Sequence, residues 1–421
     1  MTAFKTDKPI FEMVAYLPTT WTGAMVHGGG AGLNGFLASF IPFWNQTQPL
    51  QQGLVYIASN GGNNDPSGRL LLDRETLVDY SYRQIGTTYE FGQQIMKAYY
   101  AASPQHNYFM GCSRGGGEAM VAAALYPDNY DGIVAQAPAP EVKAFIARSA
   151  SQGPLTPLTS DEWNQINTQY INQCDALDGV TDGVVSARQS CTFDPIAWVA
   201  SQNWTADKQA TVRSQYSDLK LSDGTLINQK YGLGPFFDLT SLGQPWLRIA
   251  KNDFSWTYDV KTFNLDADYG AISAMVDSVS LDVDPLLLGQ FLRKGKKVLV
   301  FMGGDDTALS IEATNAYMAK TVALSGGNGA NTQTRFFPGV GHCGIPNATT
   351  LLGPDSAEML GALRNWVEKG TAPGAMVATK LNADGTVKAT RPLCLVGTYP
   401  KYKGSGDVNK AENFTCAADG T

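Results

Sequence analysis

Hydrophobic residues occur in the first third of the chain as short runs separated by amphipathic segments. Residues 11–17 alternate apolar and polar side chains, whereas 54–58 is a continuous apolar run and 107–110 is apolar after Asn107. Alternation is typical of a half-buried strand, and a short continuous run is typical of a buried one. Residues 87–101 instead repeat apolar side chains at helical spacing. The pattern predicts strands that alternate with helices, as in a parallel α/β sheet.

The same alternation continues with a helix over about 118–125 and a strand over 132–135, and then stops near residue 140. The following segment is richer in Asn, Gln, Asp, Ser and Trp, and strand-like sequence resumes only at 297–302. An insertion between two sheet strands explains this interruption. We therefore predict a sheet domain in two parts, residues 1–140 and 291–421, with an inserted domain at 141–290.

Composition narrows the possible roles. The 421 residues are 43% hydrophobic and 16% charged, with a formal net charge of −7 and no basic stripe, so a nucleic-acid partner is not expected. No apolar run reaches about 18 residues, so no membrane span is expected either. The sequence does not predict the oligomeric state.

The six cysteines form no C-x-x-C pair, and their even number in spaced pairs suits three disulfides in an oxidising compartment. A cytosolic protein with buried thiols is the alternative. Residues 1–20 show no signal peptide, so we interpret Met1 as a start placed before a mature chain and expect a secreted or periplasmic protein.

A candidate nucleophile lies in the segment Gly111-Cys112-Ser113-Arg114-Gly115. Gly-x-Ser-x-Gly is weak evidence alone, but here an apolar strand enters it and a helical pattern leaves it. That is the strand–turn–helix setting of a nucleophile elbow, in which glycines leave room for a tight turn. The alternative is an ordinary glycine-rich turn between a strand and a helix.

A serine hydroxyl needs a base, and the chain has three histidines. His106 precedes the strand that leads to the serine, so we expect it at the opposite end of the sheet. His27 begins a glycine loop. His342 follows a predicted strand over 335–337, the position at which α/β-hydrolases carry their base. We therefore select His342.

Both candidates have a cysteine neighbour: Cys112 precedes Ser113, and Cys343 follows His342. A disulfide holds its two Cα atoms roughly 5.5 Å apart. A Cys112–Cys343 bridge would therefore hold the serine beside the imidazole.

The base in turn needs a carboxylate that fixes its tautomer. The strand at 297–302 runs into Gly303-Gly304-Asp305-Asp306, upstream of the histidine, which matches the hydrolase order Ser, Asp, His. Either aspartate could serve.

The run His27-Gly28-Gly29-Gly30 is similar to the oxyanion loop of esterases. The backbone amides of Gly29 and Gly30, with that of Arg114 after the nucleophile, are the predicted oxyanion donors. A flexible glycine loop without such a role is the alternative.

The segment from Cys174 to Cys191 contains three closely spaced aspartates with interleaved glycines. Hard oxygen ligands on a turning loop suit Ca²⁺, although the spacing is not that of an EF-hand. A series of Asp-Gly turns without metal is equally consistent. The predicted ligands are the carboxylates of Asp175, Asp178 and Asp182 and the carbonyls of Val180 and Val184.

Together these residues resemble the tannase/feruloyl esterase family of α/β-hydrolases, which includes mono(2-hydroxyethyl) terephthalate hydrolase. The resemblance spans about residue 10 to Cys416 and rests on Cys112-Ser113, an aspartate, and His342-Cys343. It implies an α/β-hydrolase fold whose inserted domain is a lid with a calcium loop. It also implies Asp306 as the acid, and disulfides Cys174–Cys191 and Cys394–Cys416.

The resemblance further implies a serine ester hydrolase, feruloyl esterase- or tannase-like, that works through an acyl-enzyme. Its substrates would be small aromatic esters of hydroxycinnamoyl, galloyl or terephthaloyl type, with structural Ca²⁺ and no organic cofactor. A catalytically inactive binding module and a serine peptidase of the same fold are the alternatives. Arg114 and Arg248 are candidates for binding a substrate carboxylate or phenol, and several lid aromatics could stack on the acyl group: Trp198, Trp204, Phe236, Phe237, Trp246 and Trp256.

Overall fold

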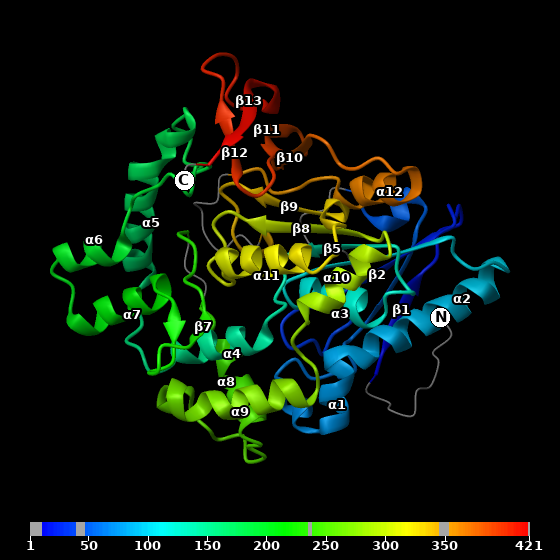
Figure 1. Cartoon of the computed structure of the whole chain (residues 1–421), viewed down its shortest axis with the longest axis horizontal. Helices are drawn as coiled ribbons and strands as arrows, with labels where there is room; N and C mark the ends of the chain where they lie inside the picture. Colours follow the sequence, from blue (N-terminus) through cyan, green and yellow to red (C-terminus); the bar gives the residue numbers. More distant parts are fainter. Residues whose placement is uncertain (1–10, 39–46, 235–237, 345–352, 420–421) are drawn as a thin grey trace.

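A seven-stranded sheet forms the centre of the molecule in the computed structural model, which describes residues 11–38, 47–234, 238–344 and 353–419 (Figure 1). The strand order is β1-β3-β2-β4-β5-β8-β9. Only the edge strand β1 runs antiparallel to its neighbour, β3; the other pairs are parallel. The strands are β1 (Met13–Tyr16), β2 (Ala24–Gly28), β3 (Val55–Ser59), β4 (His106–Cys112), β5 (Gly132–Gln136), β8 (Lys297–Gly303) and β9 (Thr332–Phe337).

Helices cover both faces of this sheet because its central strands are apolar on both sides. Phe109 of β4 packs with apolar side chains of α3, α10 and α11, whereas its neighbour Met110 belongs to the cluster that includes α12. Met96 of α2 packs on β2 and β3. These helices are α2 (Gln84–Tyr100), α3 (Arg114–Leu125), α10 (Pro285–Arg293), α11 (Ile311–Ala323) and α12 (Met359–Lys369).

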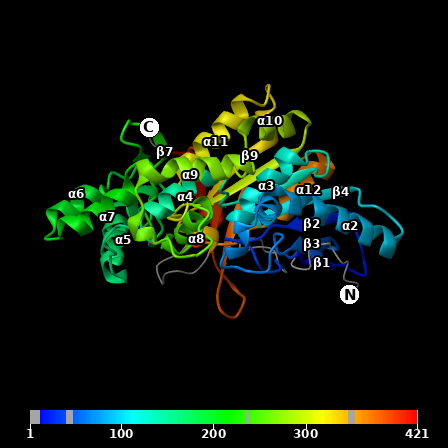
Figure 2. The same cartoon turned by 90° about the horizontal axis from the view of Figure 1, so that it is seen from below.

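The insertion between β5 and α10 builds two further cores. In one, α4, α8 and α9 pack together; in the other, α5, α6 and α7 do. In both views the helices α5, α6 and α7 lie beside the sheet, far from α2 (Figures 1 and 2). The elements are α4 (Val142–Ser151), α5 (Ser160–Cys174), α6 (Pro195–Ser201), α7 (Ala206–Tyr216), β6 (Leu219–Lys220), β7 (Leu226–Asn228), α8 (Thr240–Ala250) and α9 (Leu265–Ser278).

Two antiparallel pairs end the chain. They are β10 (Met376–Leu381) with β11 (Val387–Leu393), and β12 (Thr398–Tyr402) with β13 (Phe414–Ala418). The Cys394–Cys416 disulfide joins the end of the first pair to β13. Within the described part of the chain, no helix has the length and apolar character needed to cross a bilayer.

The predicted strands match β1, β3, β4, β5 and β8 to within two residues at each end, β9 begins three residues earlier than predicted, and the strand–helix alternation is confirmed. No strand was predicted for β2. Two further boundaries differ. The helix after the serine begins at Arg114 rather than near residue 118, because its glycine-rich first turn carries little periodic signal. His27 and Gly28 were assigned to a loop, but they complete β2, which is paired on both sides.

Candidate active site

The turn between β4 and α3 holds Ser113 in an uncommon backbone conformation, with φ 59° and ψ −121°. Non-glycine residues with positive φ are strained and concentrate at functional sites. The Ser113 amide donates to the Gln136 carbonyl at 3.0 Å, which holds the turn. A Cβ at Gly115 would lie 2.5 Å from the Gly30 carbonyl oxygen, so the close approach of the two loops requires glycine there. The predicted nucleophile elbow is therefore present.

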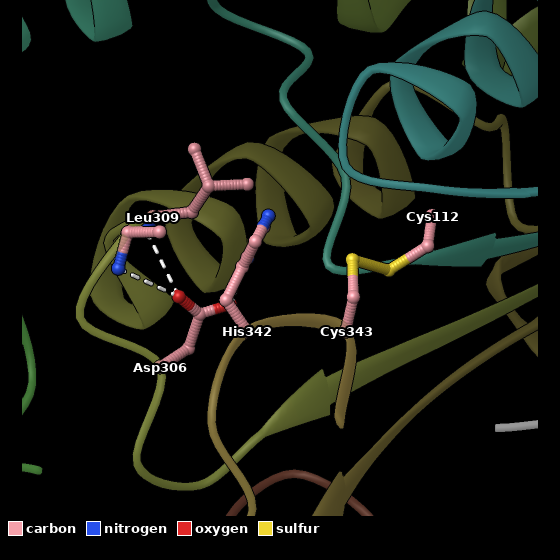
Figure 3. Close-up of a disulfide and its surroundings, with 6 residues drawn as sticks. Cys112, Asp306, Leu309, His342 and Cys343 are labelled. Carbon is pink, nitrogen blue, oxygen red and sulfur yellow. Dashed lines mark hydrogen bonds and ion pairs between the residues drawn. A yellow bond between two sulfur atoms is a disulfide. The ribbon is translucent and has the colours of Figure 1, made fainter. Parts of the chain in front are cut away.

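Asp306 and His342 meet in a buried hydrogen bond. His342 Nδ1 lies 2.9 Å from Asp306 Oδ2, and the Asp306 side chain has no exposed surface (Figure 3). The other oxygen, Oδ1, accepts the amides of Ala308 and Leu309 at 2.8 and 3.0 Å. These two donors hold the carboxylate with Oδ2 directed at the imidazole.

Asp305, the other aspartate left open by the sequence, faces elsewhere. Its neighbours are Arg188 and Tyr170. Burial raises the pKa of the Asp305 carboxyl to about 7, although the Arg188 charge acts in the opposite direction. The aspartate beside the histidine is therefore Asp306.

A disulfide joins the two catalytic loops. Cys112 and Cys343 are bonded, with Cα atoms 6.0 Å apart, across a sequence separation of 231 residues (Figure 3). Cys174–Cys191 and Cys394–Cys416 are the other two bonds, so all three predicted disulfides are confirmed. Ser113 and His342 line the same cavity.

The backbone amides of two predicted oxyanion donors already donate hydrogen bonds within the protein. The Gly29 amide donates to the Met110 carbonyl at 2.9 Å, because it extends the parallel ladder between β2 and β4. The Gly30 amide donates to Glu118 Oε2 at 2.8 Å. The assignment of Gly29 and Gly30 as donors is therefore wrong in this structure. Ala31, the next residue of the loop, lines the cavity, and the Arg114 amide lies in the first turn of α3, where amides have no intrahelical acceptor.

Glu118, on α3, holds the glycine loop against the nucleophile helix, and the sequence reasoning missed it. It is 1% exposed; besides the Gly30 amide it accepts the Asn34 side-chain amide at 2.8 Å. Arg114 Nε lies 3.3 Å from Glu118 Oε1, and Arg114 Nη2 donates to the Tyr80 and Ser81 carbonyls. The (i, i+4) spacing of an arginine and a glutamate just after the serine was the available signal.

The cavity beside Ser113 has a volume of about 340 Å³ and is walled by both the sheet domain and the insertion. Of the lid aromatics named from the sequence, Trp246 of α8 lines this cavity. Trp198, Trp204 and Trp256 are not among its lining residues, and Phe236 and Phe237 lie outside the described residues. Its described lining is Gly29, Gly30, Ala31, Gly32, Phe36, Ala38, Tyr80, Cys112, Ser113, Arg114, Ala139, Val142, Phe145, Leu239, Leu242, Trp246, Ala308, Leu309, His342 and Cys343.

Neither arginine proposed from the sequence offers a free charge to the cavity. Arg114 faces the cavity, but Glu118 balances its charge. Arg248 donates to the Tyr258 carbonyl, stacks on Trp256 and is not a lining residue.

The other two histidines lie away from this chemistry. His27 is buried in β2, where Nδ1 lies 2.8 Å from the Tyr130 hydroxyl, and burial lowers its pKa to about 3. A neutral structural imidazole is the consequence. His106 begins β4, at the end of the sheet opposite the serine, as expected.

The carboxylates of the predicted calcium loop are held by backbone amides and by one arginine. Asp175 accepts the amides of Asp182 and Gly183, and Asp182 is held by the Val184 amide and by Arg391. Asp178 accepts the Val180 amide, and burial raises its pKa to about 6. Over the described ranges, no three His, Cys, Asp or Glu side chains cluster in a way that could hold a metal ion. Asp178 Oδ2 is nevertheless buried without a hydrogen-bond partner in the described structure, so calcium binding by Asp175, Asp178, Val180, Asp182 and Val184 stays a prediction.

Comparison with known sequences identifies one family over almost the whole chain. Residues 2–227 and 250–417 match the sequence model described as "Tannase and feruloyl esterase". A probable feruloyl esterase B-1 of Aspergillus fumigatus is 28% identical over 97% of this chain and 83% of its own length. A probable feruloyl esterase B-2 of Aspergillus terreus is 30% identical over 96% of this chain and 82% of its own length.

Solved structures agree. An esterase from Aspergillus oryzae superposes with a TM-score of 0.84 at 25% identity, covering 99% of this chain and 89% of that one. Tannin acyl hydrolase from Aspergillus niger superposes with a TM-score of 0.79 at 19% identity, covering 99% of this chain and 85% of that one, which shows a shared fold.

Proposed function

The chain belongs to the tannase and feruloyl esterase family and is a carboxylic ester hydrolase; from this premise we propose that it cleaves small aromatic esters through an acyl-enzyme formed on Ser113. The observation that carries the proposal is the buried Asp306–His342 hydrogen bond, which a disulfide joins to the strained turn at Ser113. An apolar cavity of ligand size is lined by Ser113, His342 and the two bridged cysteines.

In the proposed reaction, His342 accepts the Ser113 proton as the hydroxyl oxygen attacks the ester carbonyl. Asp306 holds Nδ1–H, so that Nε2 is the basic nitrogen, and it stabilises the imidazolium that forms. The alcohol leaves with the proton from His342. Water, activated by the same imidazole, then releases the acid and restores Ser113.

We propose the Ala31 and Arg114 amides as the oxyanion donors, in place of the occupied Gly29 and Gly30 amides. One such donor contributes roughly 3 kcal/mol of transition-state stabilisation. Glu118 would act as a positioning residue, because its bonds to Gly30 and Asn34 determine where the loop presents Ala31.

The insertion would serve as a lid, since α4 and α8 supply one wall of the cavity. A secreted location is supported by the three disulfides, which pair all six cysteines.

A panel of methyl esters tests the proposed activity: ferulate, p-coumarate, gallate and 4-carboxybenzoate. We expect turnover of at least one of them and a loss of at least about 10⁴-fold in kcat on Ser113→Ala. Ser222→Ala, on an exposed loop, is the control and should keep full activity. A fluorophosphonate should label Ser113 in the wild type; no turnover together with no adduct would refute the proposal.

A further inference from the structure

The cavity beside Ser113 is almost entirely apolar. Five of its described lining residues carry a polar side-chain atom: Tyr80, Ser113, Arg114, Trp246 and His342. The remaining walls are glycine, alanine, other aliphatic and phenylalanine side chains and the two bridged cysteines. What each polar atom does therefore determines which ligands the cavity can accept.

Most of these polar atoms are already engaged. The Tyr80 hydroxyl donates to the Gly32 carbonyl at 2.8 Å. Arg114 donates to the Tyr80 and Ser81 carbonyls, and Glu118 neutralises its charge. Ser113 and His342 belong to the reaction itself, so the remaining polar side chain among the described lining residues is the Trp246 indole, which is a neutral donor.

The negative charge of Asp306 also disfavours the binding of an anion in the cavity. Asp306 is fully buried beside His342 and Leu309, and it places a negative charge behind the cavity. A carboxylate bound there would lose its hydration without gaining a cation, and it would be repelled by Asp306.

We propose that this site selects esters whose acyl group is uncharged, such as benzoyl or cinnamoyl groups, and rejects acyl groups that carry a carboxylate. The inference rests on the proposed function, since it concerns the acyl site of the same serine. Of the three aromatic classes expected from the family resemblance, it favours the hydroxycinnamoyl class. It excludes terephthalate monoesters, and it disfavours galloyl esters, whose three hydroxyls would lose hydrogen bonds to water.

Two matched substrates test this proposal. Methyl 4-acetylbenzoate and methyl 4-carboxybenzoate have similar size and ring substitution, but at pH 7.5 only the second is charged. Because both are methyl esters, the ring must occupy the acyl site. We expect kcat/KM to be about 100-fold higher for the acetyl ester, and a difference below tenfold would overturn the proposal.

An arginine introduced into the cavity wall tests whether charge causes the preference for the neutral ester. Leu242, on α8, is half-buried and lines the cavity, so Leu242→Arg should reduce the preference for the neutral ester at least tenfold, whereas Leu242→Met should leave it in place. Phe36→Arg, at an exposed lining position, is the second variant if the first does not fold. An unchanged preference in a folded arginine variant would contradict the electrostatic explanation. Absence of turnover of every ester, with no adduct on Ser113, would instead refute the ester hydrolase mechanism itself.

Discussion

Removing the Cys112–Cys343 disulfide should reduce both stability and kcat, and the two effects have different physical origins. The bond joins the residue before the nucleophile to the residue after the base. In the double variant Cys112→Ser, Cys343→Ser, the unfolded chain gains freedom, and the folded chain loses a constraint between the two catalytic loops.

The loss of stability follows from the length of the loop that the bond closes. For a separation of 231 residues, loop-closure entropy corresponds to about 5.5 kcal/mol at 25 °C. The Cys394–Cys416 bond, with a separation of 22 residues, corresponds to about 3.4 kcal/mol. That pair lies in the C-terminal strands and not in the cavity lining, so its double serine variant is the matched control.

Urea unfolding monitored by circular dichroism measures the first effect, and kcat at low temperature on the best ester of the panel measures the second. We expect the Cys112/Cys343 variant to lose more stability than the control and at least tenfold in kcat, whereas the control keeps its kcat. Thiol titration of the denatured proteins confirms which bonds are absent.

A folded Cys112/Cys343 variant with wild-type kcat would refute the geometric role of the bond. Equal destabilisation of the two variants would refute the loop-length argument.

Three further predictions concern single carboxylates. Asp306→Asn should lower kcat roughly 10⁴-fold, because an amide favours the wrong His342 tautomer; a loss below tenfold at saturating ester would exclude this role. Glu118→Gln should lower kcat about 10- to 100-fold with little change in KM, because glutamine has one carbonyl oxygen for the two donors, Gly30 and Asn34; full kcat would show that Ala31 is positioned without it. The contribution of Asp305 to the unfolding free energy should fall by up to about 4 kcal/mol as pH rises from about 4 to 7, because this carboxyl, with its pKa raised to about 7, binds more protons in the folded than in the unfolded state over that range. Asp305→Asn should flatten that dependence in urea midpoints taken at pH 4.5 and 7.5, and identical slopes for both proteins would contradict the assignment.

Part of the site could be read from the sequence because it is encoded locally. The strands at 107–110 and 297–302 are apolar after their first residue, and a short apolar run is typical of a buried strand. Ser113 and His342 could be identified from short motifs. Glycines around Ser113 allow a tight turn, and the cysteines next to Ser113 and His342 can bond to each other. The resemblance carried the choice of Asp306.

The tertiary structure decided whatever depends on competition for hydrogen bonds between distant residues. Whether the Gly29 and Gly30 amides are free depends on Met110 and Glu118, and whether Arg114 can bind an anion depends on Glu118. Likewise, the hydrogen bonds of the aspartates near Cys174 to backbone amides and Arg391 depend on distant residues. A local sequence pattern specifies which hydrogen-bond donors and acceptors exist, but the packing of distant residues decides which of them pair. The sequence therefore determined the catalytic residues, whereas the fold determined the polarity of the cavity beside them.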